Sequence, residues 1–434
     1  MPAAAGGRHV VVRLTRPRPG SRPLAALLAG LVLPVALPVA VPAPASAEDV
    51  SCLGTGPDDP APSSETASAP LAAIGAVRAQ DWLRRTGRAE AGDGTTVAIV
   101  SSGIAGAADL PVVGGTSVVG AGPVTDPTGT VVAGLVAGAP RSADLPVGVA
   151  PAARLLDVRV YDTATPSQEG QDAPSAAALA DGLAWVRGQS SVDVVVVPLQ
   201  LPRDDRVDEL VADLVGDGVL VVAQSGDRPD DLGVEDGDSL TALATPAPGE
   251  DAGPVIHPAA VPGVVAVGPE PEEISGDPLR SSAIDVVAPS LLAVSTSLAG
   301  GTCVVDEASS AWSAGLVAGV LAMLRSAFPQ ESPEELVARL VGTADGRPDV
   351  PSPLTGAGRV QAFDALTATP GELRSGGYAG DTTVPASSTT ASPPEEPADL
   401  LAGTRGSAVW WGLVGGAALL LSLLLRPLLA RRPR

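Results

Sequence analysis

Few side chains in this sequence can remove a proton at neutral pH. All 27 basic residues are arginine, which stays protonated, so a serine–lysine dyad is excluded. The two histidines are His9 and His257. His9 lies in a leader that we expect to be cleaved, and we interpret His257 as a structural residue in a loop beside a strand. Acyl transfer by serine needs a base within hydrogen-bond reach, so this inventory argues against that reaction.

The segment Ser309 to Gly319, SSAWSAGLVAG, offers two adjacent hydroxyl groups. Ser309 and Ser310 precede a stretch rich in Ala, Leu and Val, where serine commonly caps the first turn of a helix. We favour this capping role, with a nucleophilic role as the alternative. Trp312 either lines a cleft or packs beneath the helix, and we favour packing.

Short β-branched runs alternate with Ala/Leu-rich stretches from Thr95 onward. This alternation predicts an α/β fold with a central, mostly parallel sheet covered by helices on both faces. The predicted strands are 96–100, 154–160, 192–197, 219–223, 264–267 and 285–288. The predicted helices are 71–83, 130–138, 176–187, 207–216, 310–328 and 333–341.

Four segments resemble motifs of subtilisin-type serine proteases, in the order of that family. SSAWSAGLVAG resembles G-T-S-x-A-x-P-x-V-A-G and places Ala311 at the nucleophilic serine. VAIVSSGI at 97–104 resembles V-A-V-I-D-T-G-V and places Ser101 at the aspartate. DPTGTVVAG at 126–134 resembles D-x-H-G-T-x-V-A-G and places Thr128 at the histidine. LVVAQSGD at 220–227 resembles the strand end A-A-x-G-N and places Asp227 at the oxyanion asparagine.

The resemblance implies a three-layer subtilisin-like domain whose chemical groups are replaced. A methyl group cannot attack a carbonyl, and a carboxylate at Asp227 would repel a developing oxyanion. Asp126 keeps its family position, where it caps the following helix. We therefore expect no catalytic residue at the positions that match the family's triad and oxyanion site, namely Ser101, Thr128, Ala311 and Asp227.

Both ends of the chain carry membrane-related signals. Residues 1–47 hold five arginines, no acidic residue, an apolar stretch and the sequence Ala45-Ser46-Ala47, which is typical of a cleaved signal peptide. Residues 408–425 carry no charge, and a helix of that length spans about 27 Å, close to a bilayer core. The arginines of 426–434 favour a cytoplasmic tail. We expect a single-pass plasma-membrane protein with its N-terminal domain outside the cytoplasm.

The predicted organisation has six parts. A segment rich in Pro, Ser and Thr cannot bury enough apolar surface to fold, which predicts a linker before the span. The parts are a signal peptide (1–47), an N-terminal extension (48–91), a subtilisin-like domain (92–369), the linker (370–407), a transmembrane helix (408–425) and a cytoplasmic tail (426–434).

Cys52 and Cys303 are the only cysteines. Outside the membrane an isolated pair most often forms a disulfide, and two buried free thiols are the alternative. One mature histidine and two distant cysteines provide no ligand cluster of zinc spacing, so we expect neither a metal nor a cofactor.

The charge of the chain excludes one class of partner. Its net charge is −22, and all 49 acidic residues lie within 48–399. Such a surface disfavours nucleic-acid binding. It usually serves solubility alone, and a basic protein partner is the alternative.

The order of signal, cysteine-bearing extension, subtilisin-like domain, linker and C-terminal span resembles the mycosins, membrane-anchored subtilases associated with type VII secretion. Mycosins usually carry more cysteines than the single pair found here. The resemblance implies support of the secretion complex, apart from cleavage. We therefore predict a catalytically degenerate, mycosin-like scaffold of type VII secretion. Two alternatives stay open: an active endopeptidase with an unrecognised constellation, and an extracellular protein that binds peptides in the inactive cleft.

Overall fold

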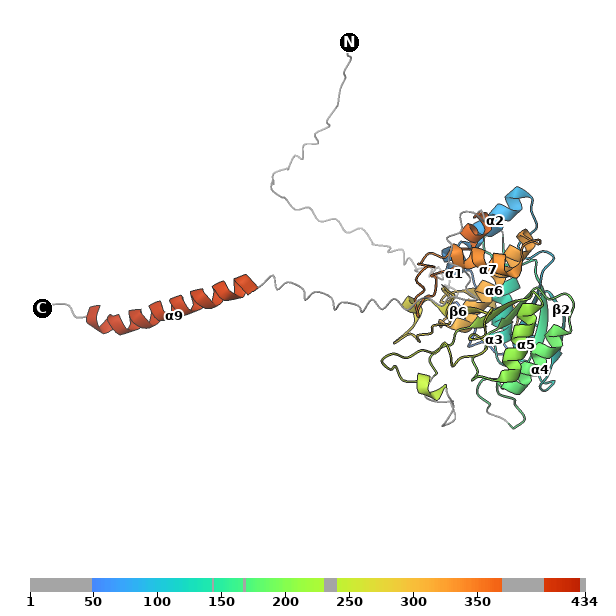
Figure 1. The fold of residues 1–434 in the computed structure, drawn as a ribbon, viewed down its shortest axis with the longest axis horizontal. Coiled ribbons are helices and arrows are strands. Elements are labelled where there is room, and N and C mark those ends of the chain that lie inside the picture. The colour runs from blue at the N-terminus through green and yellow to red at the C-terminus, as the bar shows by residue number, and fades with distance from the viewer. Residues whose placement is uncertain (1–48, 143, 167–168, 230–239, 369–401, 430–434) are drawn as a thin grey trace, which may run out of the picture. The chain divides into compact units, whose positions relative to one another are not determined.

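The computed structural model describes residues 49–142, 144–166, 169–229, 240–368 and 402–429 (Figure 1). The predicted signal peptide, most of the predicted linker and the last five residues of the predicted tail lie outside these ranges.

A seven-stranded parallel sheet forms the centre of the domain, with strand order β2-β3-β1-β4-β5-β6-β7. Its strands are β1 Thr96–Ser101, β2 Val112–Ser117, β3 Arg154–Arg159, β4 Val194–Val197, β5 Leu220–Gln224, β6 Val265–Pro269 and β7 Val286–Ala288. A separate antiparallel hairpin pairs β8 (Val294–Thr296) with β9 (Thr302–Val304). The predicted α/β fold and all six predicted strands are confirmed, each to within two residues at its ends.

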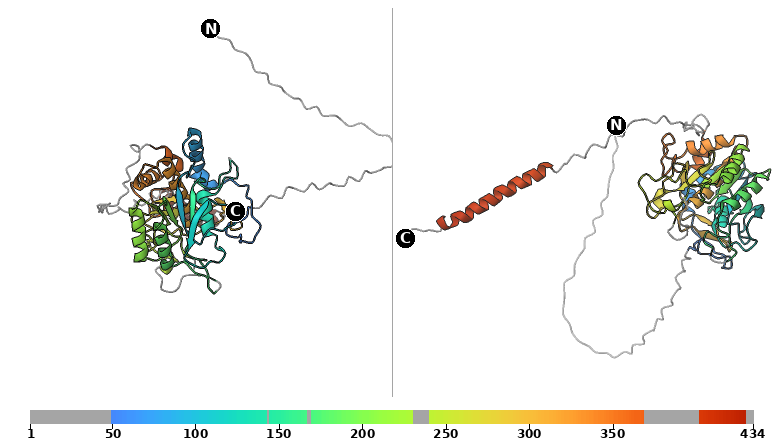
Figure 2. Two further views of the ribbon diagram at one scale, coloured as in Figure 1. Left: turned by 90° about the vertical axis from the view of Figure 1, so that its right-hand side faces the viewer. Right: turned by 60° about the horizontal axis from the view of Figure 1, so that its bottom comes forward.

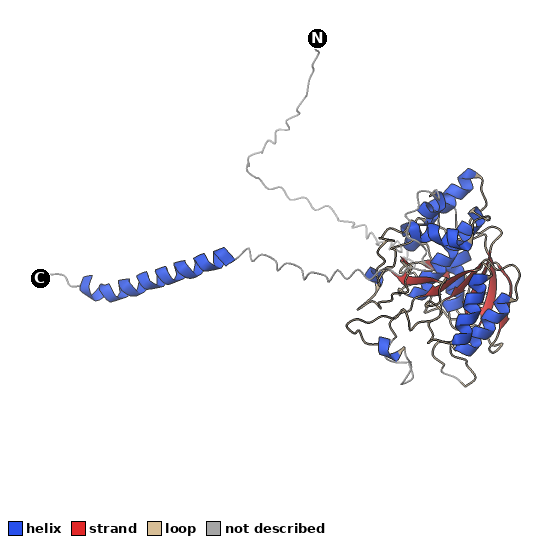
Figure 3. Ribbon diagram, viewed as in Figure 1, coloured by secondary structure: helices blue, strands red, loops and turns tan. Residues whose placement is uncertain are grey.

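Alternate residues of β1 enter two separate hydrophobic cores. Val97 and Ile99 pack with helices α3 and α6, whereas Ala98 and Val100 pack with α4 and α5. This period of two explains the unbroken apolar strands, because both faces of the sheet are covered. Figure 3 shows helices on both sides of the strands, and in both views of Figure 2 the green helices α4 and α5 lie apart from the orange helices. The helices are α3 Thr128–Ala137, α4 Ala176–Arg187, α5 Asp205–Gly216, α6 Ser310–Ala327, α7 Pro333–Gly342 and α8 Ala362–Thr367.

Two helices begin earlier than the sequence predicted. The side chain of Asp204 accepts hydrogen bonds from the N–H groups of Arg206 and Val207, so α5 starts at Asp205 instead of 207. Helix α3 starts at Thr128 instead of 130, because the carboxylate of Asp126 accepts the N–H of Thr128. Polar side chains before an apolar run mark the true helix start better than the apolar run itself.

The predicted helix 71–83 is wrong in one respect, since it is two helices. These are α1 (Ala69–Ala73) and α2 (Ala76–Thr86), separated by Ile74 and Gly75. Gly75 has φ +71°, a left-handed conformation that breaks a helix and that glycine adopts without strain. A single glycine in an apolar-periodic segment does not identify such a break, because helices also tolerate glycine.

The N-terminal extension is fastened to the domain beside the β8–β9 hairpin. Cys52 is disulfide-bonded to Cys303, as predicted, with an S–S distance of 2.09 Å. Ser51 forms a parallel bridge with Val304, and the Arg141 guanidinium donates hydrogen bonds to the carbonyl of Ser64. The extension therefore pairs with the hairpin through isolated backbone bridges at Ser51 and Ser63.

Among the described residues, one helix is long and apolar enough to cross a membrane by length and composition, and it is α6, 83% buried inside the domain. Helix α9 (Ala402–Leu429) begins within the predicted linker and contains the shorter apolar stretch Trp410–Leu424, whose side chains are exposed. This stretch lies within the predicted span 408–425. Membrane crossing and its orientation stay predictions.

One carboxyl at the start of β7 is expected to make the stability of the fold depend on pH. Asp285 accepts a hydrogen bond from the N–H of Ala266 at 2.9 Å, and burial raises its pKa to about 7. The folded chain therefore holds this proton more tightly than the unfolded chain. The stabilising effect of the proton is complete below about pH 4 and is lost as the pH rises through about 7.

The substitution Asp285→Asn tests this dependence, because it keeps a hydrogen-bond acceptor and removes the charge. We expect it to raise the free energy of unfolding by about 1–3 kcal/mol at pH 8 and to have little effect at pH 4. Urea unfolding at both pH values measures the difference. A gain of the same size at pH 4 and pH 8 would contradict the titration of Asp285.

Candidate functional site

A carboxylate at the end of β5 contacts the first turn of α6. One oxygen of Asp227 accepts the hydroxyl proton of Ser309 at 2.6 Å, and the other accepts the backbone N–H of Ser310 at 2.8 Å. The backbone N–H of Asp227 donates to the side-chain oxygen of Gln200 at 2.7 Å. These contacts join segments 82 and 83 residues apart in the sequence, so the tertiary fold creates the pair.

Ser309 has the capping role that its position predicted. It is the N-cap of α6, and its hydroxyl oxygen accepts the N–H of Ala311 at 3.1 Å while its proton points to Asp227. The side chain of Ser310 is buried. Both serines are thus parts of the helix start, and Ala311 follows them in the first helical turn.

The start of α6 is an environment that attracts negative charge. Backbone N–H groups at a helix N-terminus have no partner within the helix and carry partial positive charge. Burial raises the pKa of Asp227, whereas the hydrogen bonds from the hydroxyl of Ser309 and then the N–H of Ser310 lower it. The net effect is a pKa above the usual value of an aspartate, and both carboxyl oxygens accept hydrogen bonds. Asp227 therefore uses the donors that would otherwise face the cleft.

Ser101 and Thr128, which the sequence predicted to occupy the aspartate and histidine positions, lie together at the end of β1 and the start of α3. The adjacent Ser102 links the two elements, since its hydroxyl donates to the carbonyl of Asp126 at 3.1 Å and accepts the N–H of Gly129 at 2.9 Å. Ser101 is fully buried. Serine and threonine hydroxyls at these positions can donate and accept hydrogen bonds, but neither is a base at neutral pH.

Sequence reasoning missed Tyr161, which lies two residues after the end of β3 and is 2% exposed. Burial raises the pKa of its phenol, the Asp126 carboxylate raises it further, and the hydroxyls of Thr128, Ser101 and Ser102 lower it. The phenol therefore stays protonated and lies against both predicted triad positions. It is one of two tyrosines in the chain, and its place after a buried strand is the signal that could have identified it.

His257 lies buried beside α5, and it does not line the cavity beside Asp227. Its Nδ1 lies 2.6 Å from an oxygen of Asp208 on α5, and the residue is 6% exposed. Its backbone exchanges hydrogen bonds with Leu201. Trp312 is 5% exposed in the core, which agrees with the packing role that we favoured.

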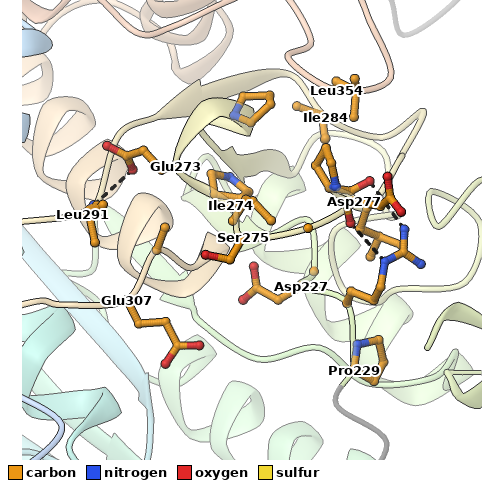
Figure 4. Close-up of a pocket in the computed structure, with 18 of the residues that line it drawn as sticks. Asp227, Pro229, Glu273, Ile274, Ser275, Asp277, Ile284, Leu291, Glu307 and Leu354 are labelled. Atoms are coloured by element: carbon orange, nitrogen blue, oxygen red, sulfur yellow. Dashed lines mark hydrogen bonds between the residues drawn. The ribbon is translucent and has the colours of Figure 1, made fainter. Parts of the chain in front are cut away.

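A cavity of about 550 Å³ opens beside Asp227 (Figure 4). Most of its lining comes from three chain segments, which are 226–229 after β5, 269–279 after β6, and 306–308 before α6, and the rest comes from Ala244, Ile284, Leu291 and Leu354. Within the described part of the chain, no group of three His, Cys, Asp or Glu residues could hold a metal ion. The site therefore combines the contact of Asp227 with the start of α6 and an open cavity beside it.

The fold and the site together define a class of protein. Its features are a parallel sheet, helices on both faces of that sheet, and a polar cluster at the starts of α3 and α6. The family model described as the Subtilase family matches residues 92–378. The chain therefore belongs to the subtilase family, as its motifs predicted.

Mycosins are among its relatives. Mycosin-3 of Mycobacterium tuberculosis (strain ATCC 25618 / H37Rv) is 30% identical over 334 residues, which cover 64% of this chain and 68% of that protein. Mycosin-1 of the same strain is 28% identical, and the match covers 64% of this chain and 69% of Mycosin-1. M-protease of Shouchella clausii (strain KSM-K16) is 28% identical, and the match covers 59% of this chain and 60% of M-protease.

Solved structures agree with this placement. The structure of MycP3 protease from the type VII (ESX-3) secretion system matches with a TM-score of 0.56 and 26% identity, over 74% of this chain and 93% of that chain. MycP1 from Mycobacterium smegmatis matches with a TM-score of 0.56 and 20% identity, over 74% and 89%. The predicted subtilisin-like fold and the predicted relation to mycosins are both confirmed.

Proposed function

We propose that this chain is a catalytically inactive, mycosin-like subtilase that serves as a scaffold of type VII secretion at the plasma membrane. The observation that carries the proposal is the contact of the Asp227 carboxylate with the hydroxyl of Ser309 and the N–H of Ser310. An oxyanion site needs free donors directed at the developing charge. Here the carboxyl group of Asp227 already accepts the hydroxyl of Ser309 and the N–H of Ser310.

The other predicted positions support the same conclusion. Ala311 has no nucleophilic atom, and the hydroxyls of Ser101 and Thr128 cannot take up a proton at neutral pH. His257 is paired with Asp208. A triad needs a nucleophile, a base and an orienting acid in hydrogen-bond contact, and no member of that set stands at the matching positions.

The relatives support the cellular context. MycP3 is named as a protease from the type VII (ESX-3) secretion system, and a scaffold role would place this chain in a related complex. The apolar helix Trp410–Leu424 supports a single membrane span, and the arginines that follow it support a cytoplasmic C-terminus. In this proposal the subtilisin-like domain lies outside the cytoplasm.

Two measurements test the proposal. We expect the purified full chain in detergent to show no labelling by a fluorophosphonate probe, because this probe needs an activated serine. We also expect deletion of the gene to reduce secretion and the yield of the purified secretion complex. Re-expression of the Ser309→Ala, Ser310→Ala double variant should restore both. An unchanged complex with unchanged secretion after deletion would exclude the scaffold role.

One contact favours the alternative of an active endopeptidase. The hydroxyl of Ser309 lies 2.6 Å from a carboxylate oxygen of Asp227, and a carboxylate can act as a general base. The same carboxylate holds the N–H of Ser310, however, so this arrangement leaves no donor there for an oxyanion. Fluorophosphonate labelling that Ser309→Ala abolishes would establish this alternative.

A further inference from the structure

Four arginines gather on and just after one short helix of the N-terminal extension. Residues 67–89 contain Arg78, Arg84, Arg85 and Arg88 and a single acidic residue, Asp81. The chain as a whole has a net charge of −22. Helix α2 therefore carries a local charge opposite in sign to that of the protein. A basic amphipathic helix is typical of surfaces that contact membranes.

Two of these arginines share the solvent face of α2 with a tryptophan. The buried residues of the helix are Ala76, Ala79, Gln80 and Leu83. Arg78 and Arg85 lie two turns apart on the opposite face, and Trp82, four residues after Arg78, lies between them. Trp82 is partly buried, whereas Arg78, Arg85 and the following Arg88 are exposed. These four residues are called here the arginine face.

The three guanidinium groups of the arginine face keep an unbalanced charge. Arg84, on the flank of the helix, forms an ion pair with Asp81. Among the described residues, no carboxylate forms an ion pair with Arg78, Arg85 or Arg88. The face therefore presents three cations to the solvent, and its electrostatic complement is an anionic surface.

Aromatic rings orient two of these cations. The guanidinium of Arg78 lies 4.0 Å from the ring centroid of Phe363 on α8, and that of Arg88 lies 5.1 Å from the ring of Trp82. Such contacts hold a guanidinium in place without neutralising its charge. Tryptophan beside arginine is also a combination that suits the headgroup region of a bilayer.

The chain leaves the domain beside the arginine face. The N–H of Ala362, at the start of α8, donates to the carbonyl of Ile74 at 2.7 Å, just before α2. The guanidinium of Arg339 donates to the carbonyl of Ala368 at 2.6 Å, just after α8. These contacts fix the point from which residues 369–401 connect the domain to α9. A tether that starts here holds this side of the domain toward the membrane that α9 is predicted to cross.

We propose that the arginine face binds the phosphate groups of anionic phospholipids in that membrane and thereby sets which side of the domain rests on the lipid. The guanidinium groups donate hydrogen bonds to the phosphates, and Trp82 lies at the level of the headgroups. Each arginine near an anionic surface strengthens binding about fivefold. The inference goes beyond the proposed function, because it rests on the predicted span and not on the loss of catalysis.

Chemical modification of arginine tests this contact in the full chain. The chain is placed in nanodiscs of phosphatidylcholine, with or without about 30% phosphatidylglycerol, and treated with phenylglyoxal, and mass spectrometry gives the rate at each arginine. We expect Arg78, Arg85 and Arg88 to react at least about threefold more slowly in the anionic nanodiscs, because bound phosphate shields them. This difference should disappear as salt is raised from about 0.05 to about 0.5 M. Arg203 and Arg206, exposed near the start of α5, are the internal reference and should change less than about 1.5-fold.

Matched variants show whether charge carries the binding. Arg85→Gln with Arg88→Gln should bring the rate at Arg78 in anionic nanodiscs to within about twofold of its rate in neutral ones. Arg85→Lys with Arg88→Lys keeps both charges and should keep Arg78 shielded. The control Arg203→Gln with Arg206→Gln removes the same charge beside α5, which packs into the other hydrophobic core, and should also keep Arg78 shielded. Unchanged rates at Arg203 and Arg206 in the first variant show that its domain is folded.

Equal rates at the arginine face in the two kinds of nanodisc would overturn the proposal. So would equal slowing at Arg203 and Arg206, because slowing over the whole surface is not binding by this face. Arginines that are shielded in the purified secretion complex but react equally in both nanodiscs would assign the face to a protein partner and refute lipid binding. A chain that does not elute with the nanodiscs would contradict the predicted span and this inference with it. The scaffold role is tested separately, by the gene deletion.

Discussion

Replacing both Cys52 and Cys303 with alanine should lower the free energy of unfolding of the domain by up to roughly 5 kcal/mol. The disulfide closes a loop with a sequence separation of 251 residues, and the entropy that a cross-link removes from the unfolded chain grows with loop length. Both cysteines are buried, so removal also leaves a small cavity. Urea unfolding of the full chain, without reductant, measures the loss.

The control for the disulfide is Ser51→Ala, which removes the hydrogen bond to Asp306 but leaves the cross-link. This variant should cost no more than about 1 kcal/mol. A double-alanine variant as stable as the wild type would show that the backbone bridges, the hydrogen bonds of Arg141 and the packing of α1 and α2 hold the extension without the cross-link.

Replacing Gly129 with alanine should cost about 2–4 kcal/mol. A Cβ atom at this position would lie 2.3 Å from the carbonyl oxygen of Gly103, and neither backbone can move without separating α3 from the turn after β1. The same contact holds Ser102 against α3, because its hydroxyl accepts the N–H of Gly129. Thermal or urea unfolding measures the loss.

Gly216→Ala is the matched control, since no atom lies within 4 Å of its Cβ position at the end of α5. It should be neutral or stabilise the domain by up to about 1 kcal/mol. If Gly129→Ala were equally neutral, the close contact of α3 with the turn after β1 would not be required, and the joint position of Ser101 and Thr128 would lose its structural basis.

The central sheet could be predicted because the composition of each strand by itself indicates a buried strand. Strands such as β1 and β4 are unbroken runs of apolar and β-branched residues, and a strand covered on both faces requires that composition. Strand β2 was missed, because Val112–Ser117 contains two glycines and lies exposed at the sheet edge. The β8–β9 hairpin was missed for a similar reason, since each strand has three residues. Neither element carries the pattern of a buried strand.

The candidate site was predictable only in part. The motifs placed Asp227 after β5 and Ala311 in the first turn of a helix, and the structure agrees with both placements. The contact of Asp227 with Ser309 could not be predicted, because no pattern in either segment encodes a partner 82 residues away. Tyr161 was missed because a tyrosine after a strand has no preferred role until its neighbours are known.

Composition decided one property of this protein by itself: outside residues 1–47 the chain has no lysine and a single histidine, so a serine–lysine dyad is excluded whatever the fold. The tertiary structure decided which groups the Asp227 carboxyl contacts. Packing of β5 against α6 brings the Asp227 carboxyl group to the hydroxyl of Ser309 and the N–H of Ser310 at the start of that helix. The sequence determines which chemical groups are present, whereas contacts between distant groups form only when the cores on both faces of the sheet are packed.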